Sequence, residues 1–285
     1  MNSSIKKITI IGTGLIGGSF ALALKRCGWM GRIVGCDSEA VLRQAKRRRA
    51  IDAGASDPLR AIAGSQVVVL ATPIFSTLDL IERLAPALAP EVLLTDVGST
   101  KRAIVRRAQA VFGQEAARRF LPAHPMAGKE RGGIANAEAG LFEGAAWTVT
   151  PFPRQRLGSG RIGEYLGLVK RTGAHVVEMD AARHDRLMAW LSHLPQMLAV
   201  ALGASLVDEF GEARDLRKVS GRQVREMTRT AASSYGIWRD IVWTNADNLG
   251  QALERLEQRL AHLRENLKSP ALREEFARAN SFRRS

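Results

Sequence analysis

Short apolar runs rich in β-branched residues alternate with amphipathic stretches up to residue 179. In stretches such as 14–26 and 39–49, the apolar positions recur at helical spacing. Strands that alternate with helices in this way are typical of a parallel sheet covered by helices on both faces. The strands that we expect are residues 7–11, 32–36, 66–71, 92–95, 120–123, 147–150 and 176–179.

The pattern changes at Asp180, where strand-like runs stop and long helical stretches begin. One such stretch covers residues 181–206, with an interruption at Pro195, and another covers residues 238–267. The second carries a leucine seam at steps of four and three, formed by Leu249, Leu253, Leu256, Leu260, Leu263 and Leu267. The seam fits the core of a helical unit and a subunit interface equally well. We therefore predict a Rossmann-type, doubly wound α/β unit over residues 1–179 and an all-α unit over residues 180–285.

The first predicted strand leads into a glycine-rich turn that matches the pattern G-x-G-x-x-G at Gly12, Gly14 and Gly17. In a dinucleotide-binding turn the first glycine allows the sharp bend, and the second lets the backbone approach a pyrophosphate. The third allows close packing of the helix on the strand. The helix that follows offers unpaired N–H groups to the phosphates. This turn, including Leu15 and Ile16, is the predicted cofactor-binding loop.

Asp37 lies 20 residues beyond Gly17, at the end of the second predicted strand. A carboxylate at this place accepts hydrogen bonds from an adenosine ribose and repels a ribose 2′-phosphate, which favours NAD. Arg43 and the basic run 46–49 leave NADP as an alternative, although such a run is also common on a solvated helix face.

Two polar residues follow predicted strands directly and are candidates for chemistry. His124 comes after the fifth strand, which Pro125 should end, and Ser99 comes after the fourth. Because ligands of open α/β sheets bind beyond the carboxyl ends of the strands, both side chains should face the nicotinamide crevice. A histidine there can take a hydroxyl proton as hydride leaves the substrate. The alternatives are a structural histidine and a serine that caps the next helix.

Several segments, in this order along the chain, resemble the prephenate/arogenate dehydrogenase family. They are GLIGGS at 14–19, ATP at 71–73, DVGSTK at 96–101, HPMAG at 124–128, HD at 184–185 and SHLP at 192–195. The stretch with Thr228, Arg229 and residues 238–240 belongs to the same set, and HPMAG with SHLP is more specific than the glycine turn.

The resemblance implies a nucleotide-binding domain followed by a helical dimerisation domain. It also implies an NAD(P)-dependent oxidative decarboxylation of prephenate or arogenate, a step of tyrosine biosynthesis. By position, His124 matches the catalytic histidine and Ser99 the serine that helps to hold it and the ring hydroxyl. Thr72 and Pro73 fall in the cofactor-binding ATP segment.

On the substrate side, the resemblance matches Arg229 to the arginine that binds a substrate carboxylate and Glu130 to an acidic residue near the entrance. A salt bridge to Glu226 or Asp240 is the alternative for Arg229. Gln196 stands near the substrate where many members have the last histidine of SHLPH.

Other departures are GRQVREMTR at 221–229 and SSYG at 233–236. Substrate choice therefore stays open, and Lys129 and Glu130 are candidates of opposite charge for recognising the substrate tail. His184 and His193 lie on apolar helices, where we expect a packing role.

Charge and composition bring in further expectations. Lys and Arg exceed Asp and Glu by 14, which attracts anions, but no nucleic-acid-binding motif accompanies this charge. Two cysteines cannot form a disulfide framework, and their spacing does not indicate a metal site, so a cytoplasmic location fits best. The longest apolar run, 197–207, is shorter than the ~20 residues that span a bilayer.

Two other function classes remain as alternatives to a dehydrogenase of this family. A β-hydroxyacid dehydrogenase also has a Rossmann domain followed by helices, but it relies on a lysine of the helical domain. Lys218 is the only lysine between residues 180 and 267. The segment HPMAG would also have no explanation in that class of enzyme. A non-catalytic NAD-binding regulator would not need Ser99, His124 and Arg229 together. The predicted partners are a small-molecule substrate and a second copy of the chain, with no nucleic acid, membrane or metal.

Overall fold

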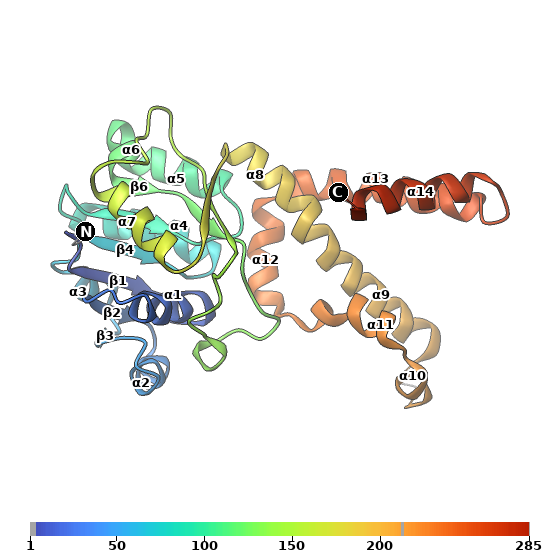
Figure 1. The fold of residues 1–285 in the computed structure, drawn as a ribbon, viewed down its shortest axis with the longest axis horizontal. Coiled ribbons are helices and arrows are strands. Elements are labelled where there is room, and N and C mark those ends of the chain that lie inside the picture. The colour runs from blue at the N-terminus through green and yellow to red at the C-terminus, as the bar shows by residue number, and fades with distance from the viewer. Residues whose placement is uncertain (1–3, 212–213, 285) are drawn as a thin grey trace.

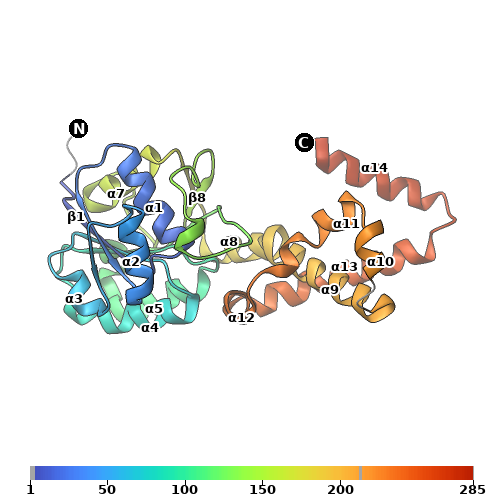
Figure 2. The ribbon, with the colours of Figure 1, turned by 90° about the horizontal axis from the view of Figure 1, so that it is seen from below.

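The structure, a computed structural model, describes residues 4–211 and 214–284. An α/β unit occupies the first part of the chain, and a helical unit extends away from one side of it (Figure 1). Figure 2 shows the same division from below, with helix α8 leading from the first unit into the second.

The α/β unit is built on a six-stranded sheet in the order β3-β2-β1-β4-β5-β6, and every pair in it is parallel. The strands are Lys7–Ile11 (β1), Arg32–Cys36 (β2), Ala53–Ala55 (β3), Val67–Leu70 (β4), Leu93–Asp96 (β5) and Phe120–Leu121 (β6). The order reverses between β1 and β4, which opens a crevice at the carboxyl ends of these two strands. Strand β3 was not predicted, because its sequence AGA has no apolar run.

Apolar side chains of the sheet separate into two clusters because successive residues of a strand point to opposite faces. Val67 and Val69 belong to the first cluster, with Phe20 of α1. Val68 and Leu70 belong to the second, with Ile81 of α4. Around the sheet lie helices α1 (Leu15–Arg26), α2 (Glu39–Arg47), α3 (Pro58–Ile62), α4 (Ile74–Leu84), α5 (Arg102–Phe112), α6 (Ala116–Arg119) and α7 (Gly160–Arg171).

The expected strand 120–123 is in fact two strands that belong to different sheets. After β6, the chain enters a second sheet of order β7-β8-β9. Its strands are Ala123–Pro125 (β7), Ala146–Val149 (β8) and His175–Glu178 (β9). Pro122 separates β6 from β7, and a proline has no N–H with which to continue the ladder of β6. The split turns His124 onto the edge strand of the small sheet.

The helical unit begins with a nearly continuous helix from Ala181 to Phe210, in three parts. These are α8 (Ala181–Met188), a π-helical turn η4 (Ala189–His193) and α9 (Leu194–Phe210). Pro195 cannot donate to the carbonyl of an α-helical turn, and the wider π turn directly before it takes up the mismatch. The remaining elements are α10 (Arg214–Val219), α11 (Arg222–Met227), a 3₁₀ turn η5 (Arg229–Ala232), α12 (Tyr235–Thr244), α13 (Ala246–Glu265) and α14 (Ala271–Arg284).

The expected helix 238–267 is broken at Asn245, whose φ of −132° is not helical. The leucine seam therefore lies on α13, except for Leu267, which follows the end of that helix. It starts in the core, with Leu249 buried against Leu194, and becomes exposed toward its end, where Leu260 and Leu267 face solvent.

The helix Ala181–Phe210 is long and apolar enough to cross a membrane by length and composition, and 33% of its most apolar stretch is buried. The apolar run 197–207, whose length alone predicts no such segment, is only one part of this helix. The helix also carries His184, Asp185 and His193, which are all fully buried, whereas its charged residues Arg183, Arg186 and Glu209 are exposed.

Candidate active site

The glycine turn between β1 and α1 has the form that a bound pyrophosphate needs. Gly12 has a φ of +91°, and a Cβ there would overlap the Ala71 carbonyl oxygen, so a side chain is excluded. A Cβ on Gly17 would overlap the carbonyl oxygen of Gly12. Around the Cβ position of Gly14 nothing lies within 4 Å, and Gly14 begins α1 without a side-chain cap. The turn thus leaves an open cradle before free helical N–H groups.

Asp37 lies beside this cradle, directly after β2. Its carboxylate accepts the backbone N–H groups of Thr13 and Ser38, both at 2.8 Å. Thr72 and Pro73 follow β4 on the other side of the crevice, where Thr72 bonds to Thr77 and Pro73 precedes α4. An NAD-type dinucleotide fits this arrangement, with the turn for its phosphates and Asp37 for its adenosine ribose.

His124 takes part in a line of hydrogen bonds that ends at a buried carboxylate. Its Nδ1 lies 3.0 Å from Nε2 of His184, and Nδ1 of His184 lies 2.8 Å from Oδ1 of Asp185. His184 and Asp185 are fully buried, whereas His124 is partly exposed. Among the described residues, Nε2 of His124 has no hydrogen-bond partner. The ring therefore presents one nitrogen to the interior and one to the outside.

Asp185 also joins the two units of the chain. Its oxygens accept the backbone N–H groups of Lys101 and Arg102, at 2.7 and 2.9 Å, at the start of α5. A carboxylate at a helix N-terminus is favoured by the helix dipole. Asn245 fixes the same segment of α8, because its side-chain amide donates to the carbonyl of Asp185 and to Nδ1 of His193.

A buried ion pair sets the position of His124 from the other side. Lys101 and Asp96, both fully buried, contact each other through Nζ and Oδ2. The Lys101 ammonium also donates to the carbonyl of Ala123 at 2.6 Å, and the N–H of Ala123 donates to Asp96 at 3.2 Å. The ends of β5 and β7 are thereby held together one residue before His124.

Burial of the site keeps its histidines neutral. Burial lowers the pKa of His124 well below 6.5, and repulsion from the Lys101 ammonium, and from His184 or His193 when either is protonated, acts in the same direction. Burial lowers the pKa of His193 to about 4. A neutral His124 at neutral pH is in the form that can accept a proton.

Ser99 follows β5, as expected, but it caps no helix. The N-cap position of α5 is Lys101, and the cap is supplied by Asp185. Ser99 is partly exposed, and in the described chain no hydrogen bond joins it to His124. Its hydroxyl is thus available to a ligand at the carboxyl end of the sheet.

The predicted substrate residues Arg229 and Glu130 form an ion pair across the two units. The expected alternative partners of Arg229 are engaged elsewhere, Glu226 with Arg222 and Asp240 with Arg239.

Gln196 and Lys129 are held next to this pair. Buried Gln196 donates to the carbonyl of Thr230, beside Arg229, at 2.9 Å. Lys129 pairs with Glu138 at 2.7 Å, so Glu130 is the member of the two that reaches the helical unit.

Reasoning from the sequence missed two residues of this site, Asp96 and Lys101, and the contact of His184 with His124. We expected His184 and His193 to pack, and both are buried, but His184 also bonds to His124. The ion pair within DVGSTK could have been predicted from the sequence, since Asp96 ends a strand and Lys101 follows it five positions later. The contact of His184 could not, because 60 residues separate it from His124.

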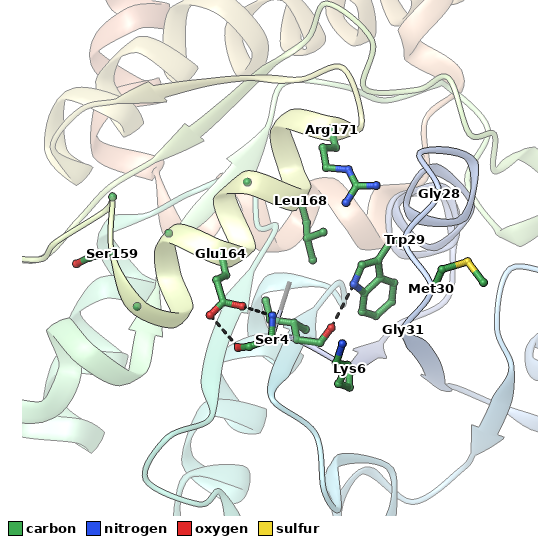
Figure 3. A pocket seen from close by; sticks show the side chains of 15 residues that line it. Ser4, Lys6, Gly28, Trp29, Met30, Gly31, Ser159, Glu164, Leu168 and Arg171 are labelled. Atoms are coloured by element: carbon green, nitrogen blue, oxygen red, sulfur yellow. Dashed lines mark hydrogen bonds between the residues drawn. The ribbon is translucent and has the colours of Figure 1, made fainter. Parts of the chain in front are cut away.

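A cavity of about 970 Å³ lies elsewhere and is lined by none of the predicted site residues. It lies between the loop after α1 and helix α7, as Figure 3 shows, where Ser4 bonds to Glu164 and the indole N–H of Trp29 donates to the Ile5 carbonyl. No cluster of metal-binding side chains occurs in the part of the chain that the structure describes.

Comparison with known families gives matches to both units. The model of the prephenate dehydrogenase nucleotide-binding domain matches residues 20–178, and that of the prephenate dehydrogenase dimerization domain matches residues 180–279. Prephenate dehydrogenase of Bacillus subtilis is 35% identical over 264 residues, covering 90% of this chain and 68% of the relative. Cyclohexadienyl dehydrogenase of Zymomonas mobilis is 30% identical, covering 91% of this chain and 87% of the relative.

Solved structures of this family have the same fold. Prephenate dehydrogenase from A. aeolicus, in complex with hydroxyphenyl propionate and NAD+, superimposes with a TM-score of 0.87 at 30% identity, covering 99% of this chain and 98% of that one. Synechocystis arogenate dehydrogenase gives a TM-score of 0.78 at 27% identity, covering 97% and 98%. The expected fold class is confirmed, and the chain belongs to the prephenate dehydrogenase family of NAD-dependent oxidoreductases.

Proposed function

We propose that the chain catalyses the NAD-dependent oxidative decarboxylation of prephenate or arogenate in tyrosine biosynthesis. The observation that carries this proposal is the accessible Nε2 of a neutral His124, at the carboxyl edge of a sheet whose glycine turn fits a dinucleotide. The enzymatic activities named for the relatives in both comparisons agree with it.

Bound in the crevice, the nicotinamide accepts a hydride. The chain has to orient the ring carbon that gives up this hydride and to manage one proton. His124 takes the proton of the ring hydroxyl at Nε2 while the C–H electron pair leaves, so a carbonyl forms instead of a cation. The bond to the ring carboxylate then breaks, CO₂ leaves and its electron pair completes the aromatic ring. His124 returns the proton to the phenolate oxygen, and Ser99 is placed to donate to this same oxygen.

Substrate carboxylates are recognised from the helical unit. The planar guanidinium of Arg229 can bind a carboxylate through two parallel hydrogen bonds. In the free chain Arg229 is neutralised by Glu130, so the substrate has to replace or rearrange this pair. An ammonium group, as in arogenate, would compensate Glu130, whereas a keto acid would not. The balance of these two residues therefore determines which tail is preferred.

We further propose that the chain is a cytoplasmic homodimer that assembles through residues 180–285, with residues 1–179 as the nucleotide-binding domain. Large apolar side chains on α9, among them Leu198, Val207 and Phe210, are exposed in the single chain. A second copy that covers them would account for the apolar character of the helix Ala181–Phe210.

The function is tested by following nicotinamide reduction with prephenate and arogenate, each with NAD and with NADP. We expect turnover with NAD and at least one of the two substrates. The preferred substrate tells whether Glu130 favours an ammonium tail. Binding of NAD without turnover of either substrate would contradict the proposal and favour an NAD-binding regulator or another hydroxyacid dehydrogenase.

A further inference from the structure

His184 has a partner at each ring nitrogen. On one side, Nδ1 lies 2.8 Å from the carboxylate of Asp185. On the other, Nε2 lies 3.0 Å from Nδ1 of His124, with the two rings edge to face. His184 is thus the connection between a fully buried acid and a histidine that reaches the surface of the site.

The surroundings of Asp185 fix the direction of each hydrogen bond in this line. Its two oxygens accept the backbone N–H groups of Lys101 and Arg102, which can only donate. A carboxylate is an acceptor throughout, so Nδ1 of His184 must donate to it. The neutral ring of His184 then carries a lone pair at Nε2. That lone pair accepts the N–H of His124 Nδ1, which leaves the lone pair of His124 at Nε2.

We propose that His184, held by Asp185, is a positioning residue that fixes His124 in the tautomer whose Nε2 can accept a proton. The proposal rests on the proposed function only for the identity of the proton donor, because the tautomer is a property of the chain itself. In the reaction the substrate O–H bond breaks and an N–H bond forms at Nε2 of His124. The N–H at Nδ1 stays bonded to His184, which relays the attraction of the Asp185 carboxylate to the new imidazolium.

The other titratable groups packed against these residues do not change the directions of the hydrogen bonds from His124 to His184 and from His184 to Asp185. Burial lowers the pKa of His184, and the hydrogen bond to Asp185 opposes this only in part. Lys101 is paired with Asp96, and His193 is neutral and accepts the amide of Asn245. None of these groups supplies a second acceptor for Nδ1 of His124. Without the His184 ring, Nδ1 of His124 should therefore lose its acceptor, and the proton should be free to occupy Nε2 instead.

The first test is a nitrogen NMR spectrum of the full chain with labelled histidine, in which protonated and bare ring nitrogens resonate apart. In the unaltered chain we expect His124 to carry its proton on Nδ1 at neutral pH. His184→Leu should shift His124 toward the Nε2-protonated form. His184→Gln, whose amide oxygen can accept the same N–H, should keep the original tautomer. His175→Leu, at an exposed histidine of β9, is the matched control and should change nothing.

The second test is steady-state kinetics of the same variants. His184→Leu should lower kcat by at least about 100-fold, because a catalytic histidine in the wrong tautomer can lose roughly 10⁴-fold in kcat, with KM for the substrate and Kd for NAD little changed. His184→Gln should recover part of this loss, since it supplies an acceptor without the link to Asp185. A merely structural histidine would instead lower thermal stability and leave the tautomer of His124 alone.

Two results would overturn the inference: His124 protonated at Nε2 in the unaltered chain, or an unchanged tautomer and kcat in a folded His184→Leu variant. A protein with the expected tautomer but without turnover would contradict the proposed function and leave the role of His184 intact. The NMR and kinetic results thus separate the two failures.

Discussion

The α/β unit and the helical unit differ in how completely each buries its own apolar residues. In the first, two continuous clusters fill both faces of the sheet. In the second, the separate buried cluster consists of Leu194, Leu249 and Ala252. Of the large apolar side chains exposed among the described residues, three lie before residue 181 and fifteen after it. The α/β unit thus buries most of its large apolar side chains within one chain, whereas the helical unit leaves many exposed, as expected if the proposed homodimer covers them.

The same contrast appears in the chemistry. In the proposed mechanism, the α/β unit supplies the dinucleotide cradle, Ser99 and His124, and the helical unit supplies Arg229 and the pair His184 and Asp185 that orients His124. On this proposal, the helical unit both forms the dimer and completes the active site. Substitutions in the helical unit should therefore impair catalysis more than they impair nucleotide binding. The following predictions test this division, from the largest expected effect to the smallest.

His124→Asn should have the largest effect, because it removes the proposed general base. We expect turnover to fall by roughly 10³-fold or more, as for loss of a general base, while Kd for NAD stays within about twofold. Stopped-flow kinetics and a binding titration measure the two quantities. Near-normal turnover would remove His124 from the mechanism.

Lys101→Met should strongly destabilise the α/β unit, because it leaves the Asp96 carboxylate buried without its partner. Loss of one member of a buried pair costs about 3–5 kcal/mol, which urea unfolding can measure. Adding Asp96→Asn should recover part of this loss. If the single variant is as stable as the unaltered chain, the pair is not what holds β5 to β7.

Val207→Glu should weaken the dimer, because Val207 is 56% exposed on α9 and would lie in the interface. We expect a dissociation constant raised by about 30-fold or more, equivalent to roughly 2 kcal/mol, as judged by sedimentation. Met30→Glu is the matched control in the α/β unit, where Met30 is 94% exposed, and it should leave assembly unchanged. Equal dissociation constants for the two variants would contradict the claim that the helical unit, and not the α/β unit, forms the dimer interface.

Arg229→Ala should raise KM for the substrate and spare Kd for NAD, because Arg229 belongs to the helical unit. A charged hydrogen-bonded contact contributes about 1.5–3 kcal/mol, which corresponds to an increase of roughly 10- to 100-fold. Arg222→Ala, at an exposed arginine paired with Glu226, is the control. An unchanged KM would mean that Arg229 serves only its ion pair with Glu130.

Acid should destabilise the fold through its buried histidines. The pKa of His193 falls from 6.5 to about 4 on burial, so the unfolded chain binds the proton first as the pH drops. The free energy of unfolding should therefore decrease below about pH 6.5, by up to ~1.4 kcal/mol per pH unit for each such histidine. Denaturant titrations between pH 7 and pH 5 measure this slope. His193→Gln should reduce it, and a slope unchanged by that substitution would contradict the assignment.

Much of the α/β unit could be predicted because its signals are local. The strands around Thr9, Val34 and Val68 are short runs of mostly apolar and β-branched residues, and the glycine turn determines what must follow the first of them. The breaks at Pro122 and Asn245 were missed because the apolar spacing continues across them. At Asn245 the side chain satisfies a carbonyl and a histidine from another helix, which no local pattern can indicate.

The candidate site was predictable only in part, for a related reason. Positions after strand ends, such as Ser99 and His124, follow from topology. The ion pair of Arg229 with Glu130 and the contact of His184 with His124 join distant segments and depend on how the two units pack. These long-range contacts are what the structure adds to the sequence.

The most direct test of the account is the stoichiometry of a single experiment with the purified chain, NAD and its preferred substrate. We predict NADH, CO₂ and the aromatic product in equal amounts for the unaltered chain and none of the three above background for His124→Asn. Formation of NADH without CO₂ would contradict oxidative decarboxylation. Equal turnover by the His124→Asn variant would contradict the central role of the histidine on which the two units converge.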